Sequence, residues 1–390
     1  MRNDVAWIEK NQHWLFPFAY LFSRIILYLA LIPTSYYGFG DLPVYFNWTT
    51  LPGWPYFNYW VEYPPLFPFI SEIIFILSNG EVFLYDFILC VIIALAGSGT
   101  IFVFQKIAHQ MYQETVAHWR TVLFFSILLM LPYTWWYAEL ITVFLMILSV
   151  WWGISKRETL AGLGIAAGIL SKWFPVFILP ALFRFYSKKQ FVKVCLIAAT
   201  IVILTFTTLY VLSPQMTLAS LRAQPNRSSW QTLWALLDGN LTTGAFLTIE
   251  DRLHPEVAGI PRGNPPVISP NLTLLVFAGI GIWFLIKRNH FDTISVIAFL
   301  GITWSLFLLW SPGWSPQWIL YLLPLILLSF PISRAYLVSM ALIGLTIFEW
   351  PLMLTRHIFL SLWIIVPLRI GLLALLISLW LPQIISAKKE

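Results

Sequence analysis

The chain contains few charged residues: Lys, Arg, Asp and Glu together make up only 10% of its 390 positions. A soluble domain is about one quarter charged and about half apolar, whereas 59% of this chain is hydrophobic. This composition excludes an ordinary soluble protein, and the long apolar runs indicate an all-α integral membrane protein rather than a barrel. The net charge of +6 fits basic cytoplasmic loops better than nucleic-acid binding.

Cysteine is almost absent as well. Cys90 and Cys195 both lie inside apolar runs, so we expect core residues, with no disulfide framework and no metal site. No GxxxxGK motif followed by Ser or Thr occurs, and no GxGxxG occurs in the strand-to-helix context that a nucleotide needs. No repeat of fixed period is seen, so the inverted repeats of many transporters are not apparent. A cleavable signal peptide is not expected either.

Apolar runs separated by basic segments predict about 12 membrane crossings with both termini in the cytoplasm. Arg2 and Lys10 precede the first run, Trp14–Pro33, and Lys388 and Lys389 follow the last. The polar residues from 106 to 120 should form a cytoplasmic loop. The whole chain, 1–390, is expected to be a single transmembrane domain.

The run from Thr159 to Phe183 has basic residues at both ends, among them Lys156 and Arg184. Both ends therefore favour the cytoplasm. A single tilted helix would leave one basic end outside. The sequence predicts instead two short helices that meet at a vertex at Lys172, beside Trp, Phe and Pro.

Three segments should form outer loops: 34–81, 213–270 and a late turn, 311–318. The first contains Gly40–Leu66, which we call the aromatic lid. Eight Trp, Tyr or Phe residues fall between Tyr45 and Trp60, and five prolines interrupt the lid. Those prolines exclude one continuous helix, and the aromatic content excludes a disordered linker. We expect a short folded lid with short interfacial helices.

Outer and intramembrane cations are costly unless an anion meets them. A phosphate is one such anion, because Arg matches its oxygens as a fork and Lys acts as a point charge. Lys172, Arg222 and Arg227 are the candidates for phosphate binding. The alternative, snorkelling or plain solvation, is favoured for Arg24, Arg252 and Arg262. It stays open for Arg369.

Acidic residues near the predicted outer surface are candidates for catalysis. Asp41 follows Gly-Phe-Gly and precedes Leu-Pro, so it is either a turn residue or a general base with a pKa raised by the surrounding rings. Glu62 is a possible second acid, or it caps a helix or holds the lid. Glu139 is either a second site residue or a helix-start acid favoured by the helix dipole, and the second interpretation is preferred. The acidic stretch from Glu250 to Glu256 is interpreted as an exposed loop.

Several of these motifs resemble those of the C-class glycosyltransferases, in particular the polyprenyl-phosphate-mannose-dependent mannosyltransferases of phosphatidylinositol-mannoside and glycosylphosphatidylinositol synthesis. The similarity rests on Asp41 after the first helix and on an aromatic loop that ends in Glu62-Tyr63-Pro64-Pro65-Leu66. It also rests on Lys172 with Pro175, and on Ser315-Pro316-Gln317-Trp318. Many members carry a second acid two positions after the first. Here Asp41-Leu42-Pro43 lacks it, which favours a site without metal and no other cofactor.

The resemblance implies inverting transfer of a sugar, with mannose first, from a polyprenyl phosphate to a lipid or glycan acceptor on the extracytoplasmic face. Asp41 would be the base, and Lys172, Arg222 and Arg227 would bind the donor phosphate. The sugar or acceptor would be lined by Tyr45, Trp48, Tyr63, Gln317 and Trp318. A transporter or lipid flippase is the alternative, since it would use the same charges along a substrate path. A non-catalytic subunit with the same fold is a third reading.

Overall fold

The computed structural model describes residues 2–30, 40–225, 227–242, 248–260, 262–286 and 290–385. Within these ranges the chain is helical, without a regular strand; two isolated bridges join Pro55 to Tyr59 and Trp230 to Gly313. The expectation of an all-α protein is confirmed. The first half contains α1 (Arg2–Ala30), α2 (Leu42–Thr49), α3 (Leu66–Leu77), α4 (Val82–Met111), α5 (Glu114–Met130), α6 (Tyr133–Trp136), α7 (Glu139–Ile154), α8 (Glu158–Ser171) and α9 (Ile178–Phe185). The second half contains α10 (Lys188–Leu212), α11 (Pro214–Ala223), α12 (Leu233–Asp238), α13 (Pro270–Ile286), α14 (Thr293–Trp310), α15 (Ile319–Ser329), α16 (Ile332–Ile347) and α17 (Leu362–Ile385).

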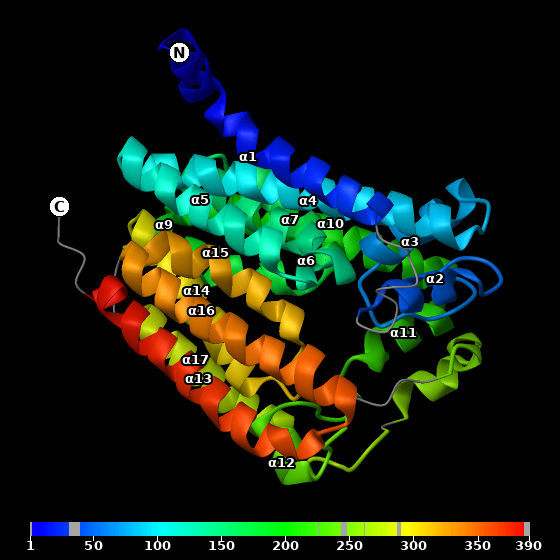
Figure 1. The fold of residues 1–390 in the computed structure, drawn as a ribbon. Coiled ribbons are helices and arrows are strands. Elements are labelled where there is room, and N and C mark those ends of the chain that lie inside the picture. Colours follow the sequence, from blue (N-terminus) through cyan, green and yellow to red (C-terminus); the bar gives the residue numbers. More distant parts are fainter. Residues whose placement is uncertain are drawn as a thin grey trace.

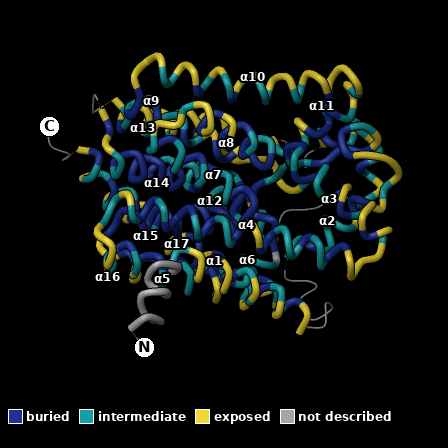
Figure 2. The backbone as a smooth tube through the Cα atoms, turned by 90° about the horizontal axis from the view of Figure 1, so that it is seen from above, coloured by how far each residue is buried: buried dark blue, intermediate teal, exposed yellow. Residues whose placement is uncertain are grey.

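The long helices run side by side, and the short helices α2, α3 and α11 lie together at one end of the bundle (Figure 1). α1 begins and α17 ends at the left of that view, whereas α2, α3 and α11 lie at the right. Every residue of α15 is buried, and α7 and α14 lie beside it in the interior. By contrast, α10 lies along the outside with most of its residues exposed (Figure 2).

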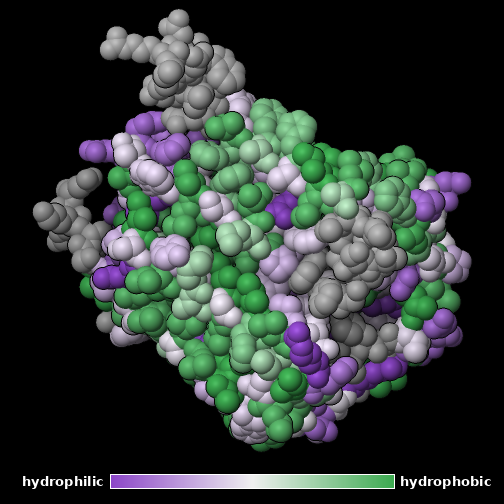
Figure 3. Space-filling model, viewed as in Figure 1, coloured by the Kyte–Doolittle hydropathy of each residue, from purple (hydrophilic) through white to green (hydrophobic). Residues whose placement is uncertain are grey.

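Among the described residues, six helices are long and apolar enough to cross a membrane. They are His13–Ala30, Val82–Met111, Lys188–Leu212, Thr293–Trp310, Ile332–Arg356 and Phe359–Ile385. On the face seen in Figure 3, hydrophobic side chains cover most of the middle and hydrophilic ones are concentrated toward the two ends. The molecule thus has the build of a helical membrane protein, while the number of 12 crossings stays a prediction.

The predicted vertex at Lys172 is confirmed. α8 ends at Ser171, Lys172 is extended, and a short 3-10 helix (Phe174–Phe177) leads into α9. The start of α8 and the end of α9 meet, because Nζ of Lys156 donates to the carbonyl of Phe185 at 3.0 Å. The chain therefore doubles back on itself, with Lys172 at the turn.

The predicted cytoplasmic loop from 106 to 120 is wrong as a loop. α4 stays helical to Met111, and α5 begins at Glu114. Polar residues here lie on helix surfaces, because the helical pattern continues beyond the apolar run. The long outer segment does begin and end as expected, between the end of α10 at Leu212 and the start of α13 at Pro270. Pro214, at the first position of α11, favours the break between α11 and α10, because it has no N–H to donate to the preceding turn.

Candidate functional site

A pocket lies where the aromatic lid meets the Lys172 vertex, the long outer segment and the late turn; its empty space of about 840 Å³ includes a part that is open to solvent. Its lining is rich in rings and carries charges of both signs. The lining residues are Asp41, Val44, Tyr45, Trp48, Glu62, Tyr63, Tyr137, Lys172, Gln224, Arg227, Trp230, Gln231, Trp314, Ser315, Pro316, Gln317, Trp318 and Trp350. Every candidate site residue named from the sequence is in this list except Arg222. Segments separated by more than 200 residues thus contribute to one pocket.

Asp41 stands at the N-cap of α2, half-buried. The hydroxyl of Tyr45, one turn later, donates to its Oδ2 at 3.3 Å. Burial raises the pKa of Asp41 to about 6, and the charge of Lys172 only partly opposes this rise. A carboxylate with such a pKa is half ionised near pH 6 and mostly ionised at neutral pH, which suits a general base.

Lys172 forms an ion pair with Glu139, the first residue of α7. Its Nζ lies 2.7 Å from Oε1 and 2.9 Å from Oε2, and both residues are buried. The hydroxyl of Tyr321 donates to the same carboxylate at 3.2 Å. Glu139 does begin a helix, as expected, but the helix-dipole interpretation missed its partner. The ammonium also faces the rings of Tyr63 and Trp318, at 5.3 and 5.8 Å from their centroids.

Glu62 pairs with Arg252 from the long outer segment. The guanidinium binds both carboxylate oxygens, at 2.6 and 3.1 Å. It also faces the rings of Trp48 and Trp60, 5.0 Å from each centroid. Burial opposes ionisation of Glu62, but Arg252 holds the pKa of that carboxyl below its usual value. A carboxylate so firmly ionised is a poor proton donor, so the geometry favours the lid-holding reading of Glu62 over the second acid.

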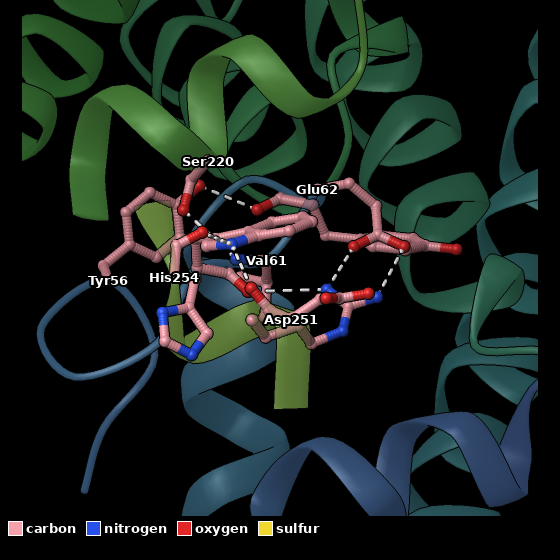
Figure 4. Close-up of polar contacts among 9 residues, drawn as sticks. Tyr56, Val61, Glu62, Ser220, Asp251 and His254 are labelled. Atoms are coloured by element: carbon pink, nitrogen blue, oxygen red, sulfur yellow. Dashed lines mark hydrogen bonds and ion pairs between the residues drawn. The ribbon is translucent and has the colours of Figure 1, made fainter. Parts of the chain in front are cut away.

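Further bonds join the same two segments. The indole N–H of Trp60 donates to the carbonyls of Asp251 and His254, both at 3.1 Å. The amide of Val61 donates to Oγ of Ser220 at 3.2 Å. Figure 4 shows Val61 and Glu62 of the lid alongside Ser220, Asp251 and His254. The long outer segment is thus fastened across the lid, next to the pocket.

One wall of the pocket is formed by residues 229–232 and 311–318, which we call the tryptophan wall. The amide of Trp230 donates to the carbonyl of Pro312, and the amide of Trp314 donates to the carbonyl of Trp230, both at 3.1 Å. The indole of Trp230 packs on Gly313, where an added Cβ would lie 2.1 Å from the ring. Its ring also carries the guanidinium of Arg227 at 4.2 Å. The wall therefore holds a cation at the pocket.

The other cations do not all behave as expected. Arg222 is exposed in the last turn of α11 and does not line the pocket. Snorkelling is wrong for Arg24 and for Arg252, which are both buried. Arg24 donates to the carbonyls of Leu128 and Leu129, which are orphan acceptors at the end of α5. Arg262 is half-exposed and pairs with Asp251 at 3.0 Å.

In the part of the chain that the structure describes, no three His, Cys, Asp or Glu side chains come together to hold a metal ion. The acidic stretch 250–256 forms two 3-10 turns. Its His254 and Glu256 are mostly exposed and lie 3.4 Å apart, which agrees with the expected polar loop.

A second, apolar pocket lies between α9, α13 and α14; its empty space of about 850 Å³ includes a part that is open to solvent. We call it the apolar groove; its lining residues include Phe177, Ala278, Gly281 and Phe307. The ring of Phe174 packs against Phe307 on one side, with centroids 5.2 Å apart, and against Trp318 of the polar pocket on the other, at 5.3 Å. One aromatic side chain thus bridges the linings of the two pockets.

Sequence reasoning missed several pocket residues. Trp230 lies three positions after Arg227, and Trp314 directly precedes Ser315. Both are aromatic residues in segments that had already been singled out, and this was the signal that could have identified them. Trp350 carried no signal, because it lies in a run read as a membrane span. Tyr137 lies in the short connection between two predicted spans and was not singled out there. A scan against protein-family models gives no match to this chain, and a search of curated proteins finds no related sequence.

Proposed function

We propose that this protein is an inverting glycosyltransferase that moves a sugar, with mannose the first choice, from a polyprenyl phosphate to a lipid or glycan acceptor. One observation supports it above all: Asp41, with a pKa of about 6, shares a ring-lined pocket with Lys172 and Arg227. A carboxylate opposite cations, next to an apolar groove, matches the chemistry of a lipid-linked sugar phosphate.

In the proposed step, Asp41 takes the proton of the acceptor hydroxyl as its oxygen attacks C1 of the sugar. The bond from C1 to the phosphate oxygen breaks, and its electron pair leaves with the phosphate. Attack from the opposite face inverts the configuration at C1. The phosphate is itself the leaving group, so no protein acid is required to protonate it.

Lys172 and Arg227 stabilise the charge that develops on the departing phosphate. Sugar hydroxyls would meet the rings of Tyr45, Trp48 and Tyr63 and the polar edges of Gln317 and Trp318. The amide oxygen of Gln317 and the indole N–H of Trp318 have no hydrogen-bond partner among the described residues. Rings that exclude water protect the donor against hydrolysis.

The apolar groove is the proposed site of the prenyl tail. It is lined almost entirely by apolar side chains and adjoins the polar pocket through Phe174. We further propose that both termini are cytoplasmic and the pocket extracytoplasmic. In support, the start of α1 and the end of α17 lie at the end of the bundle opposite α2, α3 and α11 (Figure 1).

The test is transfer from radiolabelled polyprenyl-phosphate mannose in detergent, with an extract of host lipids as acceptor, with and without EDTA. Wild type is compared with Asp41→Asn. We expect turnover that survives EDTA and falls about 10²-fold or more in the variant. Turnover that EDTA abolishes would reinstate a metal. No turnover with mannose or with a panel of other polyprenyl-linked sugars would favour the transporter or the non-catalytic subunit.

A further inference from the structure

A buried ion pair lies directly behind the tryptophan wall and outside the pocket lining. Glu349 sits in a π-helical turn (Phe348–Met353) at the end of α16, and Arg369 lies on α17. Their side chains are paired. Glu349 is 0% and Arg369 only 3% exposed. A charge pair so completely removed from water calls for a reason other than stability, because an apolar pair of similar volume is often as stable or more so.

Arg369 makes three different contacts with one planar group. It pairs with Glu349, donates to the main-chain carbonyl of Gln231, and stacks its guanidinium 4.2 Å from the ring centroid of Trp314. A guanidinium can bond in its plane and stack on its face at the same time, whereas an ammonium cannot. Two of the three partners, Gln231 and Trp314, line the pocket.

The bond to Gln231 falls at a strained point of the wall. Gln231 has φ +55°, a left-handed conformation that residues other than glycine seldom adopt without support from their surroundings. The residue before it is Trp230, which carries Arg227. Trp350, the neighbour of Glu349 in the chain, also lines the pocket.

We propose that Glu349 and Arg369 are positioning residues that fix the tryptophan wall and so set the places of Arg227 and Trp318 in the pocket. The inference rests on the proposed function, since it assigns a purpose to that same site. Glu349 fixes the guanidinium of Arg369, and Arg369 in turn fixes Gln231 and Trp314. Because these two residues belong to the wall, Arg227 and Trp318 are held in place as well.

The test uses a double variant, Glu349→Leu with Arg369→Met, that replaces both charges with apolar side chains of similar size. Arg369→Lys is the second variant, because it keeps a charge but loses the fork and the stacking. Arg120→Met is the matched control. Arg120 is another buried arginine, 4% exposed, which donates to the carbonyls of Leu327 and Phe330 and makes no contact with the pocket.

Three quantities are measured on full-length protein in detergent: thermal unfolding, kcat and KM for polyprenyl-phosphate mannose, and hydrogen exchange of peptides covering 229–232 and 311–318. For the double variant we expect an unfolding temperature equal to or above that of wild type, and a kcat about 10²-fold lower, as for a misplaced catalytic group. Donor KM should rise by a smaller factor, because a displaced Arg227 binds the phosphate less well while the apolar groove still holds the prenyl tail. Exchange should be faster in the two wall peptides and unchanged in α7. Arg369→Lys should give the same pattern in weaker form.

Wild-type kcat and wild-type exchange in the double variant would overturn the proposal. A loss of kcat that merely follows a loss of thermal stability, as in Arg120→Met, would also overturn it by making the pair structural. If wild type transfers no sugar at all, the proposed function fails. Hydrogen exchange still tests whether Glu349 and Arg369 fix the wall. Faster exchange confined to the wall would then support the positioning role, and unchanged exchange would contradict it.

Discussion

The ammonium of Lys172 lies 2.7 Å from Oε1 of Glu139, and neither residue is open to solvent. The pair joins the vertex between α8 and α9 to the first residue of α7. Its charge is thus already balanced before any ligand arrives. In the proposed reaction an incoming phosphate would have to share Lys172 with Glu139, so Glu139 would weaken the attraction of Lys172 for it.

Removing only one partner of this pair should damage folding as well as function. Lys172→Met leaves Glu139 buried and uncompensated, so we expect a loss of about 3 kcal/mol of stability. Adding Glu139→Gln should restore most of that stability but not the use of donor. Thermal unfolding and donor saturation curves of the two variants test this. A double variant as active as wild type would remove Lys172 from phosphate binding.

The pKa of Asp41 predicts how activity depends on pH. Burial raises that pKa from 3.8 to about 6, and a base acts only when it is deprotonated. The value of kcat/KM should therefore rise with pH and level off above a pH of about 6. One pH unit below the pKa, only about a tenth of Asp41 is deprotonated and able to act as a base. Asp41→Asn should show a small residual rate without this rise. A wild-type profile flat from pH 5 to pH 8 would exclude Asp41 as the base.

Gly313 is predicted to tolerate no side chain. A Cβ there would lie 2.1 Å from the indole of Trp230, so Gly313→Ala must displace that ring and the Arg227 guanidinium stacked on it. We expect a loss of about 1–3 kcal/mol, typical of overpacking, together with weaker donor binding. The matched control is Gly344→Ala, since nothing lies within 4 Å of a Cβ at Gly344. Equal behaviour of the two variants in unfolding and donor titration would show that the wall adapts freely.

Much of the layout could be predicted because it depends on local patterns. Apolar runs gave the helices, the basic residues at both ends of 156–189 gave the vertex at Lys172, and prolines gave a lid that is not one helix. Asp41, Tyr63 and Gln317 were found because polar groups in aromatic outer segments are unusual in so apolar a chain. All three line the pocket.

The pairings could not be predicted, because they depend on packing between distant segments. Arg252 meets Glu62 across 190 residues, and Arg369 meets Gln231 across 138. Composition shows only that a buried charge needs a partner, not which one. Trp350 reaches the pocket through the π-helical turn that ends α16, and an apolar run shows no sign of such a turn.

The pair of Glu62 and Arg252 gives a further prediction, which separates a lid support from a second catalytic acid. If the pair fastens the lid, Glu62→Gln and Arg252→Met should each cost about 3 kcal/mol and lower transfer alike. Their effects in the double variant should then be far from additive. Limited proteolysis of the 248–260 segment should become faster in each. Glu62 would instead be a catalytic group if two results were found together. Glu62→Gln would lose transfer while its proteolysis stayed at the wild-type rate, and Arg252→Met would keep near-normal transfer.

The apolar groove gives the last prediction, which concerns donor length. Gly281 and Ala278 line the groove on α13, so Gly281→Leu or Ala278→Leu should fill part of it without touching the polar pocket. Each buried CH2 of a lipid contributes about 0.8 kcal/mol, so excluding a few of them should raise donor KM at least 10-fold. A donor with a short prenyl chain, which does not reach the filled region, should lose little. Gly371→Leu, on α17 and outside the groove with open space around its Cβ position, controls for the added bulk. Equal KM changes for long and short donors would place the tail elsewhere.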